Sequence, residues 1–189
     1  MSQVLDRARN GVDTQQMYGT LDAIKADPSL GRFQFRVQNH WIDGAHNRST
    51  IHGFYGAGQE DTSRVAAFTI DAGEPAVLLG TDTGPNPAEF LLHALAACVT
   101  TSLVFAAAAR GVRLTAVEST LEGDLDVQGA MGISPDFRNG FEQIRMTIKI
   151  AGDAPEEKLR TIVQRGTDRS VVFDSISNGV PISVDVITG

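Results

Sequence analysis

Hydrophobic and polar residues alternate along several short stretches in the first half of the chain. These stretches are Phe33–Val37, Ser49–Tyr55, Val65–Ile70 and Ala76–Leu79. Alternation with a period of two is typical of a strand with one buried face. Turn residues at Asp43-Gly44 and at Gly56–Gly58 separate the first stretches, so we predict short strands that pair back on one another.

The second half of the chain contains longer alternating stretches. Ile144, Met146, Ile148 and Ile150 alternate with polar residues and predict a strand over residues 141–150. A longer, irregular strand is expected over residues 114–127. The alternation of Val180, Ile182, Val184 and Val186 predicts a final strand.

One long apolar segment lies between these two groups of predicted strands. Asn86 is suited to cap a helix, Pro87 to occupy its first position and Glu89 to complete a capping box. Gly111 predicts the end of this helix, which would be about 36 Å long. The segment is apolar on nearly every face, so we expect it to be buried on most sides, inside a sheet wrapped around it.

Three shorter helices are also predicted. Met17, Leu21 and Ile24 recur at helical spacing within Asp13–Ala26. A capping pattern at Asp153–Glu156 indicates the start of another helix. The third covers Ser170–Ser177 and is closed by Asn178-Gly179.

Composition narrows the function classes. The chain has 189 residues, a net charge of −7 and a single cysteine. It has no cluster of basic residues, which argues against nucleic acid and against an anionic membrane surface. His93 and the polar residues Thr100–Ser102 argue against a membrane span at 90–109. One cysteine and a polar start at residues 1–11 predict a reduced, cytoplasmic protein.

The single thiol, Cys98, lies inside the long apolar helix and is the best candidate for chemistry. A reactive thiol needs a lowered pKa. Cys98 is more than three turns from the start of its own helix, so we expect that a cation from elsewhere would be required. The alternative is that Cys98 is a buried packing residue.

Metal and cofactor sites are not indicated. None of the four histidines has a close ligand spacing, and there is no dinucleotide or Walker motif. Glu122, Asp124 and Asp126 lie on one face of a predicted strand and indicate a solvated surface, with a cation site as the alternative. We therefore predict no metal and no cofactor.

Several segments together resemble the OsmC/Ohr family of osmotically induced and organic-hydroperoxide-resistance proteins. They are Leu79-Gly80, Gly84–Leu92, Ala94–Cys98, Ala108–Val112, Glu122–Asp126 and Val172–Asp174. The resemblance covers roughly residues 31–187. It implies an α+β fold in which antiparallel sheets wrap around long central helices in an intertwined homodimer. Residues 1–30 would then be an N-terminal helical extension and residues 31–189 the OsmC-like domain.

The resemblance also implies a chemistry. In active members a thiolate attacks a peroxide, and a second cysteine then closes a disulfide that dithiols reduce. Ser170 stands where the second cysteine is expected, so the chain resembles a single-cysteine branch of the family.

The resemblance further implies that an Arg and a Glu assist the thiolate. The Glu position holds Ala88, while Glu89 faces away from Cys98 by helical geometry. Arg48 is the candidate for the assisting Arg, with Arg36 as the other choice.

Three hypotheses follow. The first is a one-cysteine peroxidase in which Cys98, with Arg48 and Glu89, reduces an organic hydroperoxide and an external thiol restores it. The second is a non-catalytic protein that binds a small ligand on the same scaffold. The third is a thioesterase of hot-dog type, which rests on fold analogy alone.

Overall fold

The computed structural model describes residues 8–189, so Asp6 and Arg7 of the N-terminal prediction lie outside the described residues. The chain divides into two compact units. Unit 1 consists of the described residues up to Val12 together with Leu92–Gly189. Unit 2 is Asp13–Leu91.

Unit 2 contains short strands and one helix. Its elements are α1 (Thr14–Ala26), the 3-10 turn η1 (Pro28–Gly31), β3 (Gln38–Asp43), β4 (His46–Ile51), β5 (Phe54–Gly56), β6 (Gln59–Asp61), β7 (Phe68–Ala72) and the 3-10 turn η2 (Ala76–Leu78). Strands β3, β4 and β7 form an antiparallel sheet in that order, and β5 pairs with β6. Gly44 has a φ of 52°, which a glycine adopts without strain, and it forms the β3–β4 turn predicted from Asp43-Gly44.

Two strand predictions in unit 2 are wrong. Residues 33–37 form only one isolated bridge, between Gln34 and Tyr55, because Phe33 and Phe35 stack on Phe54. Ala76–Leu78 is a 3-10 turn that ends at Leu79 in the left-handed region. The strands predicted over 49–55 and 65–70 are confirmed with shifted bounds.

Helix α2 (Pro87–Ala109) begins in unit 2 and continues through unit 1. Its predicted capping box is confirmed. The Asn86 N–H donates to Glu89 Oε2 at 2.8 Å, and the Glu89 N–H donates to Asn86 Oδ1 at 2.9 Å. At the other end, the Gly111 and Val112 N–H groups donate to Ala108 and Ala107 carbonyls, as in a Schellman motif.

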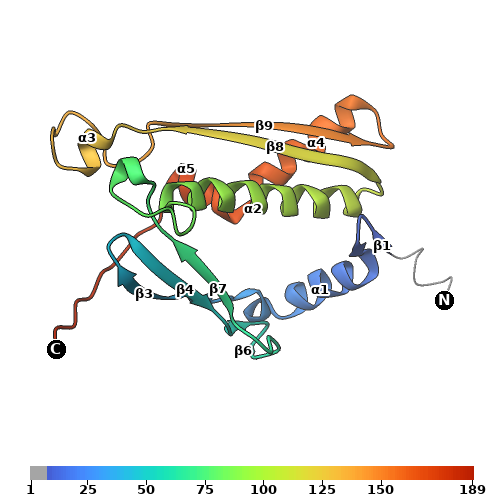
Figure 1. Cartoon of the computed structure of the whole chain (residues 1–189). Coiled ribbons are helices and arrows are strands. Elements are labelled where there is room, and N and C mark those ends of the chain that lie inside the picture. Colours follow the sequence, from blue (N-terminus) through green and yellow to red (C-terminus); the bar gives the residue numbers. More distant parts are fainter. Residues whose placement is uncertain (1–7) are drawn as a thin grey trace. The chain divides into compact units, whose positions relative to one another are not determined.

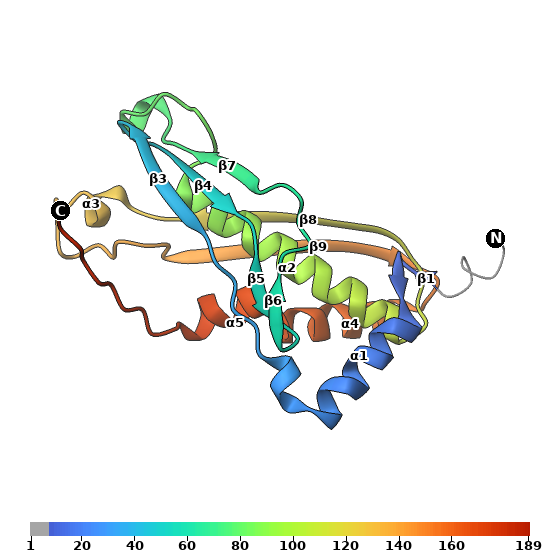
Figure 2. The same ribbon diagram turned by 90° about the horizontal axis from the view of Figure 1, so that it is seen from below.

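The remaining elements of unit 1 pack around α2. They are β8 (Leu114–Asp124), α3 (Val127–Ala130), β9 (Gln143–Gly152), α4 (Glu156–Asp168) and α5 (Val171–Asn178). Strands β8 and β9 form a long antiparallel hairpin along α2 (Figures 1 and 2). The hairpin β1 (Ala8–Arg9) and β2 (Val12–Asp13) is tied to the end of α2 by Asn10, whose side-chain amide bonds the Val112 carbonyl and the Leu114 N–H.

The hydrophobic core lies in unit 1. Its buried residues are Leu95, Val99, Leu103, Ala107, Val112, Leu159 and Ile162. The inward side chains of β8 and β9 cover this cluster because period-two alternation places them on one face. Only one stripe of α2 is buried, and Leu91 and Phe105 are exposed, so the expectation of burial on most sides is wrong for this chain by itself.

Two further predictions in unit 1 need correction. The final strand is absent among the described residues, since residues 179–189 pair with no strand and Val180–Val186 expose their apolar side chains. Asp153 does not cap α4. Its carboxylate instead accepts the Arg113 N–H at 2.7 Å, and Pro155 precedes the helix. The helix over Ser170–Ser177 is confirmed as α5, with Ser170 as its cap.

The length and composition of α2 would allow it to cross a membrane, and it is the one such helix among residues 8–189. Core helices of proteins that never enter a bilayer have the same properties. Because α2 places Val99, Leu103 and Ala107 in the core of unit 1, we interpret it as a core helix.

Candidate functional site

Cys98 lies on α2 and is half-buried. Its neighbour along the chain, Val99, is fully buried, so the buried stripe of α2 fixes the position of the cysteine. Ser102 is one helical turn further on, and its hydroxyl is hydrogen-bonded to Cys98. The thiol is therefore neither sealed in the core nor free on the surface.

The other partners of Cys98 come from the junction between α4 and α5. Gly166 of α4 packs directly on the backbone of α2, where an added Cβ would lie 2.6 Å from the Leu103 Cα. This close approach holds the end of α4 against α2. Arg169 and Ser170 follow, and α5 begins at Val171. The first turn of α5 is thereby placed at Cys98.

Four hydrogen bonds surround the sulfur. Burial alone raises the pKa of the Cys98 thiol, but hydrogen bonds from the Ser170 hydroxyl, the Val172 and Val171 N–H groups and the Ser102 hydroxyl outweigh it. The pKa is therefore lower than the ordinary value of a thiol. The first N–H groups of a helix have no partner within the helix, and they favour an anion placed there.

This arrangement corrects the expectation that a cation would be required. The groups that lower the pKa of Cys98 are neutral hydroxyl and backbone N–H donors. The dipole that helps is that of α5, not of the helix that carries the cysteine. Ser102 was detectable from its spacing of four residues, whereas no local pattern could have indicated the two backbone donors of α5.

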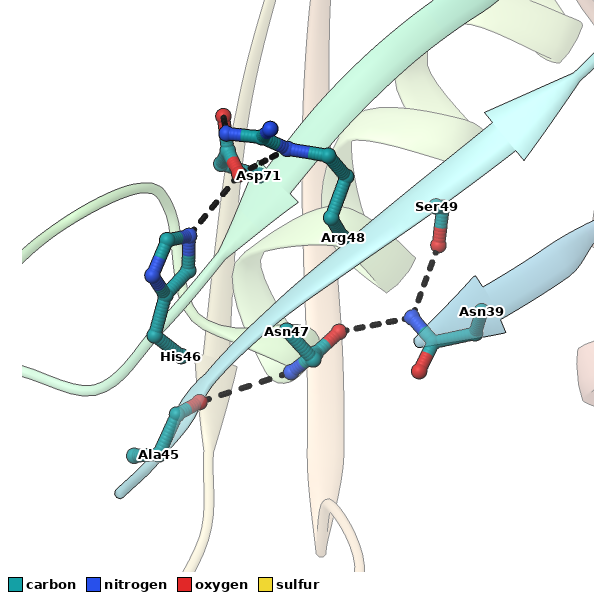
Figure 3. Close-up of polar contacts among 7 residues, drawn as sticks. All are labelled: Asn39, Ala45, His46, Asn47, Arg48, Ser49 and Asp71. Atoms are coloured by element: carbon teal, nitrogen blue, oxygen red, sulfur yellow. Dashed lines mark hydrogen bonds and ion pairs between the residues drawn. The ribbon is translucent and has the colours of Figure 1, made fainter. Parts of the chain in front are cut away.

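The predicted Arg48 lies in unit 2, on β4, directly opposite Asp71 of β7. Its Nε donates to Asp71 Oδ1 at 2.8 Å and its Nη2 to Oδ2 at 3.2 Å, and His46 Nε2 lies 2.8 Å from the same Oδ1 (Figure 3). Hydrogen bonds from Arg48, followed by that from His46, lower the pKa of Asp71. The Asp71 carboxylate raises the pKa of Arg48 in turn.

A second polar group lies on the neighbouring strands of the same sheet. Asn39 Nδ2 donates to Asn47 Oδ1 at 2.7 Å and to Ser49 Oγ at 3.0 Å (Figure 3). Arg36, the other candidate arginine, donates to both carboxylate oxygens of Glu60 at 2.7 and 2.6 Å. Both candidate arginines therefore have carboxylate partners within unit 2.

The remaining acidic candidates have structural partners. Glu89 is held by the helix cap described above. Glu122 and Asp124 both pair with Arg145 across the β8–β9 hairpin, and Asp126 caps α3. Residues 8–189 contain no group of three or more side chains suited to hold a metal ion.

A family model described as OsmC-like protein matches residues 80–185, which is more than half of the chain. The chain belongs to the OsmC-like family. The matched segment of this OsmC-like chain contains Cys98, Glu89 and Ser170 but not Arg48.

Solved structures of OsmC-like proteins share the fold. An OsmC-like protein from Mycoplasma pneumoniae matches with a TM-score of 0.58 and 14% identity, over 76% of this chain and 87% of that chain. An organic hydroperoxide resistance protein OsmC from Legionella pneumophila matches with a TM-score of 0.53 and 16% identity, over 77% and 90%. No curated protein sequence matches the chain.

The OsmC-like assignment confirms the predicted fold class, a mixed α+β fold with antiparallel sheets and a long helix. It leaves the roles of Cys98, Arg48 and Glu89 as predictions. Cys98 is the one among them with a polar environment that changes the chemistry of its side chain.

Proposed function

We propose that this OsmC-like protein reduces organic hydroperoxides through Cys98, as a one-cysteine thiol peroxidase. The observation that carries the proposal is a half-buried thiol whose four hydrogen bonds favour the thiolate. The thiolate is the nucleophilic form of cysteine. Kinship with the Legionella pneumophila protein, named for organic hydroperoxide resistance, supports the choice of substrate.

The proposed first step transfers one oxygen atom. The Cys98 thiolate attacks the terminal oxygen of the hydroperoxide, an S–O bond forms and the O–O bond breaks. The alkoxide leaves and takes a proton to become the alcohol. Cys98 is oxidised by two electrons to a sulfenic acid, and the hydroperoxide is reduced by the same two electrons.

The second step requires an external reductant, because the chain has no other cysteine. A small thiol attacks the sulfenic acid and forms a mixed disulfide with release of water. A second molecule of that thiol displaces Cys98 and leaves as the oxidised disulfide. Ser170, at the start of α5, has no thiol and takes no part in this exchange.

Arg48 and Glu89 have different places in the proposal. Arg48 uses two of its five donor N–H groups on Asp71, so three remain for an anion. We assign it the role of assisting cation, and Arg48→Lys should lower the rate. Glu89 contributes through the cap of α2. Glu89→Gln, which removes the charge but can retain the cap, should therefore leave the rate unchanged.

The test is direct oxidation of the purified protein. Cumene hydroperoxide is added, the sulfenic acid is trapped with dimedone, and Cys98 is followed by mass spectrometry. Wild type should react much faster than a free model thiol, and Cys98→Ser should not react. Oxidation no faster than that of the model thiol would exclude the peroxidase.

A second candidate function is binding of a small apolar ligand without catalysis. It is favoured by the exposed stack of Phe33, Phe35 and Phe54 in unit 2, whose ring centroids lie 5.4–6.3 Å apart. Arg64 lies 5.3 Å from the Phe54 centroid. If a ligand protects these rings and Cys98→Ser retains both binding and cellular phenotype, binding replaces the peroxidase as the function.

We further propose a homodimer in a reducing cytoplasm, with residues 1–30 as an extension of the domain at 31–189. Exposed Phe105 on α2 and the unpaired apolar tail of residues 180–187 support an assembly of copies. Light scattering should give a dimer mass, and removal of residues 180–189 should weaken it. A monomer at micromolar concentration would contradict the dimer.

A further inference from the structure

Ser170 is almost completely buried, with 1% of its surface exposed. Its hydroxyl oxygen accepts the Phe173 N–H at 3.2 Å, which is the bond expected of a helix cap. No buried side-chain nitrogen or oxygen among residues 8–189 lacks a hydrogen-bond partner. A capping serine with its acceptor position used still has one proton to donate.

That proton is directed to Cys98. The Ser170 hydroxyl is hydrogen-bonded to the sulfur, and the Val171 and Val172 N–H groups converge on it from the same turn. One residue thus joins the cap of α5 to the thiol on α2. The Phe173 N–H fixes the position of the oxygen, and the close packing of Gly166 on Leu103 fixes the start of α5 against α2.

We propose that Ser170 is a positioning residue for Cys98: held by the Phe173 N–H, its hydroxyl donates to the sulfur and keeps it oriented in its reactive form. The proposal rests on the proposed function only in that Cys98 is the reacting group. It gives the Ser170 hydroxyl a role in thiol chemistry that is separate from its role as a helix cap.

The two roles can be separated because glycine and alanine differ as caps. Alanine at the cap position costs about 0.5–2 kcal/mol of stability, whereas glycine costs only a few tenths. Both remove the hydroxyl that donates to Cys98. A role in helix capping alone predicts that Ser170→Gly behaves as wild type, whereas the positioning role predicts that both variants change Cys98.

The experiment measures the rate of Cys98 alkylation by iodoacetamide from pH 5 to pH 10, with mass spectrometry as the readout. In Ser170→Ala and Ser170→Gly the profile should shift to higher pH, and the rate near pH 7 should fall about tenfold, as expected for the loss of one hydrogen bond to an ionised group. Ser170→Thr, which keeps the hydroxyl, should restore the wild-type profile. Asn178→Ala, which breaks a bond to Asp174 at the far end of α5, should leave the profile unchanged.

A second measurement tests the contact itself. In Ser170→Cys two sulfurs replace the hydroxyl–sulfur pair, so mild oxidation should join residues 98 and 170 in a disulfide within one chain. Ser49→Cys on β4 should form no such bond with Cys98. Failure of Ser170→Cys to cross-link would contradict the proposed contact.

These outcomes are distinct from those of the peroxidase test, because alkylation and cross-linking use no hydroperoxide. Normal Ser170 dependence without hydroperoxide reduction would reject the peroxidase and keep the positioning role. Unchanged alkylation profiles in both Ser170→Ala and Ser170→Gly would overturn the positioning role, even if Ser170→Thr proved too bulky to fold.

Discussion

Units 1 and 2 have opposite internal compositions. All seven residues of the hydrophobic core belong to unit 1. In unit 2 the buried positions are the glycines Gly56 and Gly73, and its large apolar side chains are at least partly exposed. Burial of apolar surface is the main source of stability. Unit 1 therefore has its own source of stability, while the apolar surface of unit 2 is available for other contacts.

The two units also stabilise charge differently. In unit 1 the Cys98 thiolate is favoured by neutral donors on a rigid core. In unit 2 Arg48 and Asp71 form an ion pair on the sheet surface, with side chains 48% and 33% exposed. Solvent screens such an exposed pair, whereas fixed dipoles in a packed site persist. Precise tuning of a reactive group is therefore expected in unit 1.

The largest contrast should come from leucine truncation. Leu103→Ala in the core of unit 1 removes a fully buried side chain and should reduce the free energy of unfolding by about 2–5 kcal/mol. Leu79→Ala in unit 2 removes a side chain that is 93% exposed and should change it by less than about 0.5 kcal/mol. Urea unfolding measures both. Equal losses would show that Leu79 is covered in solution.

Glycine-to-alanine substitutions should give opposite signs in the two units. At Gly166 an added Cβ would meet the Leu103 backbone, and overpacking of this kind costs about 1–3 kcal/mol. At Gly19 on α1 an added Cβ meets nothing within 4 Å, so alanine should stabilise by up to about 1 kcal/mol. Thermal unfolding compares the two variants. A stable Gly166→Ala would remove the argument that α4 packs tightly on α2.

The pH dependence of stability should distinguish the units next. The folded pKa of Cys98 is below its unfolded value of about 8.5, so its thiolate stabilises the fold above that pH. This contribution is lost as the pH falls through the folded pKa. Wild type should therefore gain stability relative to Cys98→Ala between pH 6 and pH 9.5, as measured by urea unfolding. A constant difference would contradict the lowered pKa.

Local signals in the sequence predicted much of the fold but less of the site. Asn86 and Glu89 are three residues apart, and Ser170 lies next to the helix it caps, so both caps could be identified from sequence. The contact between Cys98 and Ser170 depends on how α4 packs on α2, which no local pattern encodes. Residues 33–37 and 180–186 have strand patterns, but alternation indicates a partly buried face and cannot supply a pairing strand.

The smallest effect should come from the polar pair of unit 2. The pKa of Asp71 is lowered by Arg48 and His46, so its carboxylate stabilises the fold above the ordinary aspartate pKa of about 3.9, and this contribution is lost as the pH falls through the folded value. Asp71→Asn should unfold slightly more easily at pH 7 and match wild type near pH 2. Because the pair is exposed, high salt should reduce the difference at pH 7. A salt-independent difference would indicate that another part of the protein or a second copy covers this pair, and unit 2 would then be less solvent-exposed than its own surface indicates.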